Sequence, residues 1–404
     1  MFEAFAERDY RRFWTAQFIS NIGSWMQAVA QGWLVYRLTD SAFLLGFVGF
    51  ATTAPSIFLM LPGGVIADQL DRRRVIAASQ WAQAACALLL AISIRTGHIT
   101  VWQIIAAALT VGVAQSFSAP AYQAMVVDLL DDRSRLSNAV AMNSLQFNLS
   151  RVLGPLLASV ALSAWGSFWC FFLNALSFLP LLFILRRIKK RQHPHEGPSA
   201  ILTKLREGFA YVRGDRLVLL LLSAAAAGSL FGYPYLNLMP VLARQLFAND
   251  AAGNGYLIGA NGAGALLAAL ALSMATPRRA HMLGIIVAAT LTYGVSLSLV
   301  GLGGGGAPVV MALLVVCGAG MVASLALCNT MIQQRIPDGM RGRVMSMYTF
   351  SFFAFIPFGN LMAGAVAEER GIRFTFALLG GALILTGLAL GVSGSRLAAV
   401  RRES

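Results

Sequence analysis

The sequence predicts an all-α integral membrane protein with twelve transmembrane helices, arranged as two six-helix pseudo-repeats. The first observation is composition: 57% of the 404 residues are hydrophobic and only 12% are charged, whereas a soluble domain carries about 25% charged residues. The second is length, because apolar runs of about 20 residues alternate with short polar segments, and such a run spans the core of a bilayer. The third is an internal repeat, described below. A large soluble protein with deeply buried helices does not account for so many runs of this length.

Each apolar run is expected to be a helix, because every backbone amide must find a hydrogen-bond partner within the protein when lipid surrounds it. Membrane β-strands would need alternating patterns of about ten residues, and the sequence has none. The expected spans are residues 13–36, 42–66, 75–94, 101–127, 138–165, 167–185, 217–243, 253–275, 282–302, 308–333, 344–366 and 373–395.

The distribution of basic residues predicts the side of the membrane on which each loop lies. Of the 31 Lys and Arg residues, 25 fall in the two termini and in the loops that follow even-numbered spans. Positive charge is retained on the cytoplasmic side, so we expect both termini and the central loop to be cytoplasmic in a bacterial-type inner membrane. The net charge of +14 then reports orientation and contact with anionic lipid, not nucleic-acid binding. The five cations of the opposite face are Arg37, Arg95, Arg244, Arg370 and Arg373.

Polar landmarks recur at an offset of 206 residues. Two six-helix units in the same orientation are the parallel-repeat plan of one large class of transporters. The aligned pairs include Asp9 with Asp215, Gly112 with Gly318 and, after one residue of slippage, Gly154 with Gly359. The expected organisation is an N-terminal half at 1–185, a cytoplasmic linker with an amphipathic segment at 186–216, and a C-terminal half at 217–404.

The loop between the second and third spans, GGVIADQLDRRRV, carries a glycine, an aspartate four residues later, and a basic cluster. It resembles the corresponding loop signature of the major facilitator superfamily, although Gln69 and Asp71 depart from the usual pattern. The "RVLGP" segment of the fifth span, with Gly154 and Pro155, is most similar to the enterobactin-exporter and macrolide-efflux branch. The matching loop residues are Gly64, Asp68, Arg72, Arg73 and Arg74.

The resemblance implies a monomeric, ion-coupled carrier, with a proton as the suspected ion, that works by rocking two halves about a central site. It also implies a contact between Asp68 and the start of the eleventh span, near Arg343. Independently, an anion at one helix end can accept hydrogen bonds from the free amides that begin another helix. The alternative is that the loop is only a tight turn with cytoplasmic charge.

Uncharged polar residues follow several spans at helical spacing. The resemblance places the first, fourth, seventh and tenth spans around the cavity, so we expect some of these residues to line a substrate path. Helix packing is an equally good explanation for any one of them. The candidates are Asn21, Ser24, Gln27, Gln31, Gln115, Tyr122, Asn148, Arg151, Tyr233, Asn237 and Asn329.

Arg151 is the one charge inside the fifth span. It lies 14 residues beyond Ser137, about 21 Å along a helix and therefore near the midplane of the bilayer. Gly154 would let a neighbouring helix approach, and Pro155 frees the carbonyl of Arg151. We expect the side chain to face the bundle and to bind a negative group on the substrate or to order the cavity. The alternative is a lipid-facing arginine whose head reaches outward.

The predicted function is secondary transport of a small amphipathic compound, drug-like or siderophore-like, with efflux as the favoured direction. Alternatives are an importer of a small solute or a lipid transporter. The sequence has no phosphate-binding loop, zinc-ligand spacing or nucleophile motif, so it predicts no enzyme activity, cofactor or metal. All 17 acidic residues lie at helix ends, in loops or in the termini, which leaves the group that would carry a coupling proton unidentified.

Overall fold

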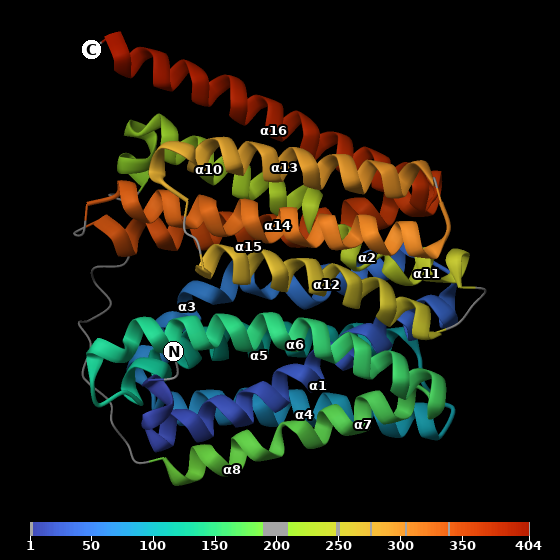
Figure 1. Cartoon of the computed structure of the whole chain (residues 1–404). Helices are drawn as coiled ribbons and strands as arrows, with labels where there is room; N and C mark the ends of the chain where they lie inside the picture. Colours follow the sequence, from blue (N-terminus) through green and yellow to red (C-terminus); the bar gives the residue numbers. More distant parts are fainter. Residues whose placement is uncertain are drawn as a thin grey trace. The chain divides into compact units, whose positions relative to one another are not determined.

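A computed structural model describes most of the chain (Figure 1). The described residues are 3–188, 209–247, 251–274, 277–303, 305–337 and 340–403, with the backbone alone described at 61, 65, 68, 133, 251, 341, 342 and 395–403. Every regular element within these ranges is a helix. The predicted linker at 186–216 therefore lies largely outside the described residues.

The first six predicted spans are all covered by helices. The second and sixth spans are each divided into two helices, with Pro55 and Pro180 in the first turns after the breaks, because proline cannot continue the hydrogen-bond ladder of a preceding helix. Side-chain caps start three of these helices: Ser41 accepts from the amide of Leu44, Asp71 accepts from that of Arg73, and Thr100 forms a capping box. The helices are α1 (Arg8–Thr39), α2 (Ala42–Thr53), α3 (Pro55–Gln69), α4 (Arg72–Arg95), α5 (Val101–Asp128), α6 (Leu136–Ala164), α7 (Ser167–Ser177) and α8 (Leu179–Arg187), with the short 3-10 turns η1 (Glu3–Ala6) and η2 (Arg133–Arg135).

The last six predicted spans are covered as well, and the seventh is irregular. Around Pro234 it passes from an α-helix through a π-helical turn and a 3-10 turn before it resumes as a short helix. The elements are α10 (Arg216–Ala227), η4 (Gly228–Gly232), η5 (Pro234–Leu236), α11 (Met239–Leu246), α12 (Ala251–Met274), α13 (Arg279–Leu302), α14 (Ala307–Arg335), α15 (Arg341–Arg370) and α16 (Ile372–Glu403).

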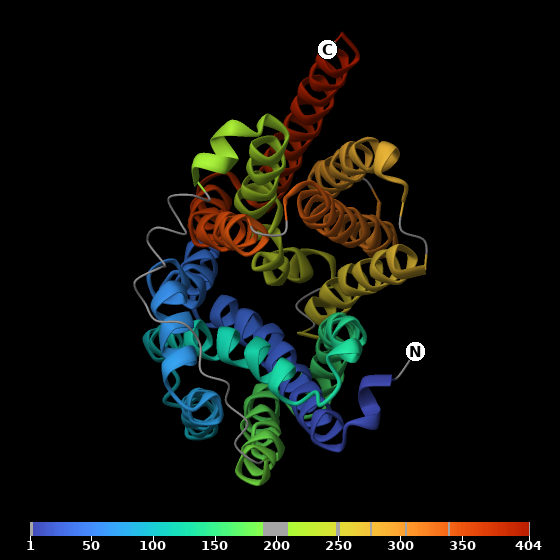
Figure 2. The ribbon, with the colours of Figure 1, turned by 90° about the vertical axis from the view of Figure 1, so that its left-hand side faces the viewer.

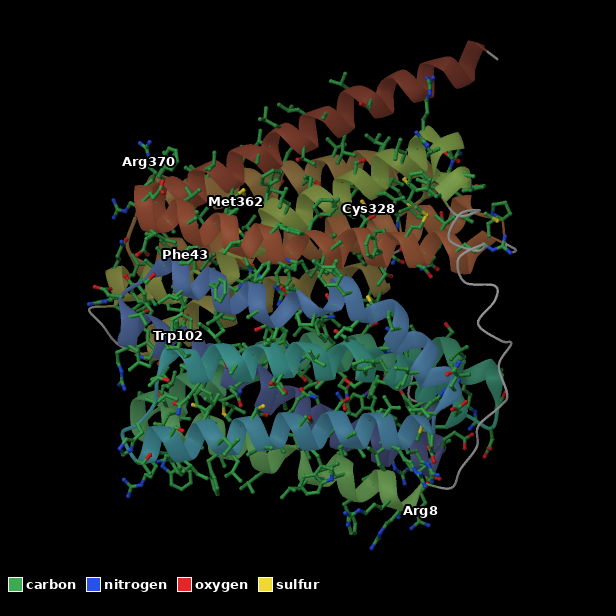
Figure 3. All side chains as sticks on the ribbon, turned by 180° about the vertical axis from the view of Figure 1, so that it is seen from behind. Arg8, Phe43, Trp102, Cys328, Met362 and Arg370 are labelled. Carbon is green, nitrogen blue, oxygen red and sulfur yellow. The ribbon has the colours of Figure 1, made fainter. Side chains whose placement is uncertain are left out.

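Eleven helical segments of the described chain are long and apolar enough to cross a membrane. The first helix, α1, is not among them, because glutamine, serine and asparagine residues recur along its 32 residues. In the first unit, Arg8 lies at one end, and Phe43 and Trp102 lie at the opposite end (Figure 3). The second and fourth spans therefore begin at the end of the unit opposite to the start of α1.

The chain divides into two compact units. The first contains α1 to α8 together with Pro240–Gly259, and the second contains α10, η4, η5, the rest of α12 and α13 to α16. In the second unit α13 packs along α14, as Figure 2 shows, and along α16. The predicted division at 217 assigns residues 240–259 to the C-terminal half, whereas their contacts group them with the first unit. The reason is local: Asn254 Nδ2 donates to the carbonyl of Val29 at 3.0 Å, and Ser159 Oγ donates to that of Ala252 at 3.1 Å.

The same glycine crossings occur in both units, at the positions that the 206-residue offset aligns. A Cβ atom on Gly112 would overlap the carbonyl oxygen of Thr52, and one on Gly318 would overlap that of Asn261. Likewise, α6 meets α1 at Gly154, and α15 meets η4 at Gly359. Only a residue without a side chain lets these backbones approach so closely. The structure thus gives the internal repeat a geometric basis.

We expect Gly154→Ala to destabilise the protein, because the new methyl group would overlap the Cβ of Trp25 and lie 2.9 Å from the carbonyl oxygen of Ile22. Relieving such overpacking costs about 1–3 kcal/mol. The matched control is Gly284→Ala, also in a helix, where nothing lies within 4 Å of the added atom. Thermal unfolding in detergent should show a lower midpoint for Gly154→Ala alone. Equal midpoints for the two variants would contradict the crossing described here.

Candidate functional site

Arg151 is buried in the first unit, with only 5% of its surface exposed. Its guanidinium carbon lies 6.0 Å from the centroid of the Trp25 ring on α1, within range of a cation–π interaction. Gly154, one turn further along α6, brings α1 close enough for this contact. Arg151 therefore faces a neighbouring helix, as an arginine reaching outward through lipid would not.

A series of hydrogen bonds joins α1 to α6 between Arg151 and the start of α6. Tyr10 Oη donates to the carbonyl of Ala139 at 3.0 Å. One turn further, Trp14 Nε1 donates to the carbonyl of Met142 at 3.1 Å, and Gln146 Nε2 donates to that of Trp14 at 2.7 Å. We call these contacts the α1–α6 ladder. They hold the two helices in one register between the start of α6 and Arg151.

Two polar atoms at the end of the α1–α6 ladder nearer to Arg151 in α6 have no hydrogen-bond partner among the described residues. Gln17 Oε1 and Ser150 Oγ are both buried without a hydrogen bond. Gln17 lies one turn beyond Trp14, and Ser150 lies one turn beyond Gln146 and directly before Arg151. An unsatisfied buried polar group costs about 1–3 kcal/mol. A polar ligand or a water molecule that bonds to Gln17 and Ser150 would remove that cost.

Sequence reasoning missed Tyr10, Trp14, Gln146 and Ser150. The signal for the two α6 residues was present, because Gln146 and Ser150 are one turn apart on one face of α6. Gln17 belongs to the polar stripe that the sequence already shows along the first span. The two aromatic residues could not be separated by sequence from those that face lipid.

Some residues predicted to line the substrate path in the first unit are explained by helix packing, and others remain partly exposed. Asn174 Nδ2 donates to Gln27 Oε1 at 2.7 Å in a buried contact between α7 and α1, so packing explains Gln27. Asn21 Oδ1 accepts from Gln17 Nε2 at 2.9 Å, beside the unsatisfied atoms. Ser24 and Asn148 donate within their own helices, to the carbonyls of Ser20 and Ser144. Tyr122 Oη on α5 donates to Gln146 Oε1 on α6 at 3.5 Å, Gln31 is half-buried, and Gln115 is exposed.

In the second unit, a polar pair lies beside the irregular seventh span. Asn237 Nδ2 donates to Asn360 Oδ1 on α15 at 2.8 Å, and Asn360 is buried with its own Nδ2 unsatisfied among the described residues. Tyr233 packs edge-on against Phe352, with ring centroids 6.2 Å apart. Asn329 Oδ1 accepts from Gln333 on its own helix, α14. Sequence reasoning found Asn237 and missed its partner Asn360.

The loop between α3 and α4 is held by ion pairs. Arg72 Nη1 lies 2.6 Å from Asp128 Oδ2 at the end of α5, and the two side chains are only 4% and 10% exposed. Arg73 pairs with Asp71 at 2.7 Å and donates to the carbonyl of Ile188 at 2.6 Å. Two of the five loop residues thus bind neighbouring elements of the first unit.

The other residues of the loop signature, and Arg343 at the start of the eleventh span, form fewer contacts with neighbouring elements. Arg74 is exposed, and nothing lies within 4 Å of a Cβ placed on Gly64. Asp68 lies in α3, but its side chain is outside the described residues, and Arg343 Nη1 contacts the sulfur of Met340 at 3.3 Å. The contact of Asp68 with the start of the eleventh span therefore stays a prediction.

Comparison with protein families finds a match over residues 1–402 to a family model described as transmembrane secretion effector. The staphyloferrin A transporter of Staphylococcus aureus is 24% identical over 380 residues, which cover 91% of this chain and 92% of the relative. The multidrug efflux pump Tap of Mycobacterium tuberculosis is 27% identical over 391 residues, with 92% and 90% covered. The macrolide efflux protein A of Streptococcus pyogenes is 24% identical, with 92% of each chain covered.

Solved structures share the fold. The nucleoside transporter NupG, as a D323A mutant, superposes with a TM-score of 0.75 at 13% identity, covering 95% of this chain and 99% of that chain. A POT family transporter in complex with a thioalcohol-conjugated peptide also has a TM-score of 0.75, at 14% identity and 96% coverage of both chains. At these identities the likeness concerns the fold, and it confirms the predicted fold class.

Proposed function

Because the chain belongs to the transmembrane secretion effector family of the major facilitator superfamily, we propose that it exports a small amphipathic compound with an anionic group across a bacterial inner membrane. Membership confirms the resemblance found in the loop and in the fifth span. The protein is a multi-pass membrane protein and a secondary transporter of small molecules, not an enzyme. The proposal concerns the cargo, the direction and the residues.

The observation that carries the proposal is Arg151. A charge near the midplane costs about 2.5–3.5 kcal/mol even on the insertion scale that gives the lowest penalty, and this one is buried in the first unit, where Gln17 Oε1 and Ser150 Oγ are also buried without a hydrogen bond among the described residues. Arginine presents a planar fork of donors that matches a carboxylate. A carboxylate-bearing, siderophore-like cargo fits this environment better than a cationic drug does. The name of the staphyloferrin A transporter is consistent with such a cargo.

Alternating access between a cytoplasmic and an external opening would move this cargo. The buried Arg72–Asp128 pair supports a gating role for the loop that also contains Asp68. A proton gradient is the proposed energy source, with both termini cytoplasmic and a monomer as the working form. An importer of the same fold, or a lipid transporter, is the rival function.

Transport into inverted inner-membrane vesicles tests the direction and the cargo. With an imposed proton gradient, we expect vesicles that contain the protein to accumulate an iron-free siderophore that carries carboxylate groups, and a protonophore to abolish the accumulation. Vesicles without the protein are the control, and a macrolide serves as the competing cargo. Accumulation only in right-side-out vesicles would show import, and uptake of the macrolide alone would overturn the anionic cargo.

A further inference from the structure

A pocket of about 420 Å³ lies at one end of the first unit, where α1 and α4 end and α6 turns into α7. Trp102, labelled in Figure 3, marks this end, because it is the second residue of α5 and follows the short loop after α4. By the charge distribution this is the external end. The residues around the pocket are Arg37, Ile94, Arg95, Trp165, Gly166, Ser167, Phe168 and Trp169.

The pocket is strongly positive. Only five cations are expected on the external face of the protein, and two of them, Arg37 and Arg95, line this one pocket. Within the part of the chain that the structure describes, neither arginine forms an ion pair or a hydrogen bond. Asp40, the acid nearest to Arg37 in the sequence, is paired with Arg244 at 2.5 Å. Two like charges therefore share the pocket without a counterion from the protein.

The start of α7 adds to this positive character. The chain turns at Gly166, whose φ of 83° favours glycine, and α7 begins at Ser167 in the wall of the pocket. The first amides of a helix have no intrahelical partner, and the helix dipole makes this end attractive to anions. The free amides and the two guanidinium groups all favour a negative ligand.

The rim of the pocket is aromatic and exposed. Trp165 is 61% exposed and Trp169 is 40% exposed, with their ring centroids 6.3 Å apart, and Phe168 packs edge-on against Trp169. Exposed tryptophans gather where the bilayer meets water, because the ring is apolar and its N–H remains hydrated. The positive pocket therefore lies at the depth of lipid headgroups, beside the acyl chains.

We propose that this pocket binds the phosphate of an anionic phospholipid of the outer leaflet, of the phosphatidylglycerol or cardiolipin type. Arg37, Arg95 and the first amides of α7 hold the phosphate, and the aromatic rim contacts the acyl chains. A soluble anion would use the charges but not the exposed tryptophans, so the observations favour a lipid. The lipid anchors the ends of α1 and α4 at the membrane surface. This site is separate from the cargo site around Arg151, and its test is independent of cargo.

Native mass spectrometry of the full-length protein tests the proposal. The wild-type protein is titrated with phosphatidylglycerol and, separately, with phosphatidylcholine, and we expect a preference for phosphatidylglycerol. In the Arg37→Gln/Arg95→Gln variant the apparent affinity should fall about 30-fold, since each basic residue near the surface contributes about 5-fold to the binding of an anionic lipid and the two factors multiply. The matched control is Arg370→Gln/Arg373→Gln, which removes the same charge from the same predicted face and should bind like the wild type.

Two further arms separate the outcomes. Inorganic phosphate in millimolar excess should not displace the lipid, and displacement would assign the pocket to a free anion instead. Equal binding of the two lipids by the wild-type protein, or unchanged affinity in the double variant, would overturn the proposal. If the double variant folds poorly, two other measurements test the same proposal. One is the affinity of Arg95→Gln for phosphatidylglycerol, and the other is quenching of tryptophan fluorescence in the wild-type protein by brominated phosphatidylglycerol.

Discussion

Replacing Arg151 with glutamine is expected to reduce transport of an anionic cargo by at least 10-fold, without loss of membrane insertion. Hydrogen bonds to a charged group contribute about 1.5–3 kcal/mol, which corresponds to roughly 10- to 150-fold in binding. Insertion should be unaffected, because the variant removes a costly charge from the middle of the membrane. The measurement is the initial rate of uptake into inverted vesicles at matched expression.

Two controls interpret the result. Arg151→Lys keeps the charge but loses the planar fork, so it should retain part of the activity. Arg370→Gln, which removes an exposed charge at the C-terminal end of α15, on the face expected to be external, should transport normally. A cationic macrolide, if carried, should be less affected by Arg151→Gln than the anionic cargo. Normal transport by Arg151→Gln would show that the buried arginine is merely tolerated, and equal loss of both cargoes would indicate a structural role.

The second large effect is expected from Asp128→Ala, which leaves Arg72 charged and buried. The pair is 2.6 Å apart, and both side chains are at most 10% exposed. Removing one partner of a buried pair costs about 3–5 kcal/mol, so the midpoint of thermal unfolding in detergent should fall by roughly 5–15 °C. Asp132→Ala is the matched control, because Asp132 faces Arg135 at 3.5 Å with half of its side chain exposed. That variant should unfold near the wild-type temperature.

The double variant Arg72→Leu/Asp128→Leu separates stability from gating. Replacing a buried ion pair with apolar residues of similar size is often neutral or stabilising, so the double variant should recover most of the lost midpoint. If it is stable but does not transport, the pair contributes to the gate. A midpoint for Asp128→Ala equal to that of the wild type would contradict the buried pair.

The sequence identified some site residues and missed others for physical reasons. Arg151 was found because a charge inside an apolar run is costly and therefore conspicuous, and Gly154 was found because a motif contains it. Asp128 was not recognised as the partner of Arg72, since 56 residues separate them and both lie at helix ends, where charges are common. Asn360 was missed because an uncharged amide in an apolar span has no distinctive signature until its partner is known.

The sequence by itself determined the fold class, the twelve spans, the expected orientation and the family. It could do so because lipid leaves an apolar segment of about 20 residues only one local solution, the helix, and because charge alone biases which loops cross the membrane. The tertiary structure alone decided which polar residues meet: Gln27 with Asn174, Arg72 with Asp128, and Gln146 with the backbone of Trp14. Those contacts depend on the register and crossing of helices that are distant in sequence, and glycines such as Gly154 set that register by allowing backbones to touch. A linear pattern specifies the face of a helix but not the helix it will face.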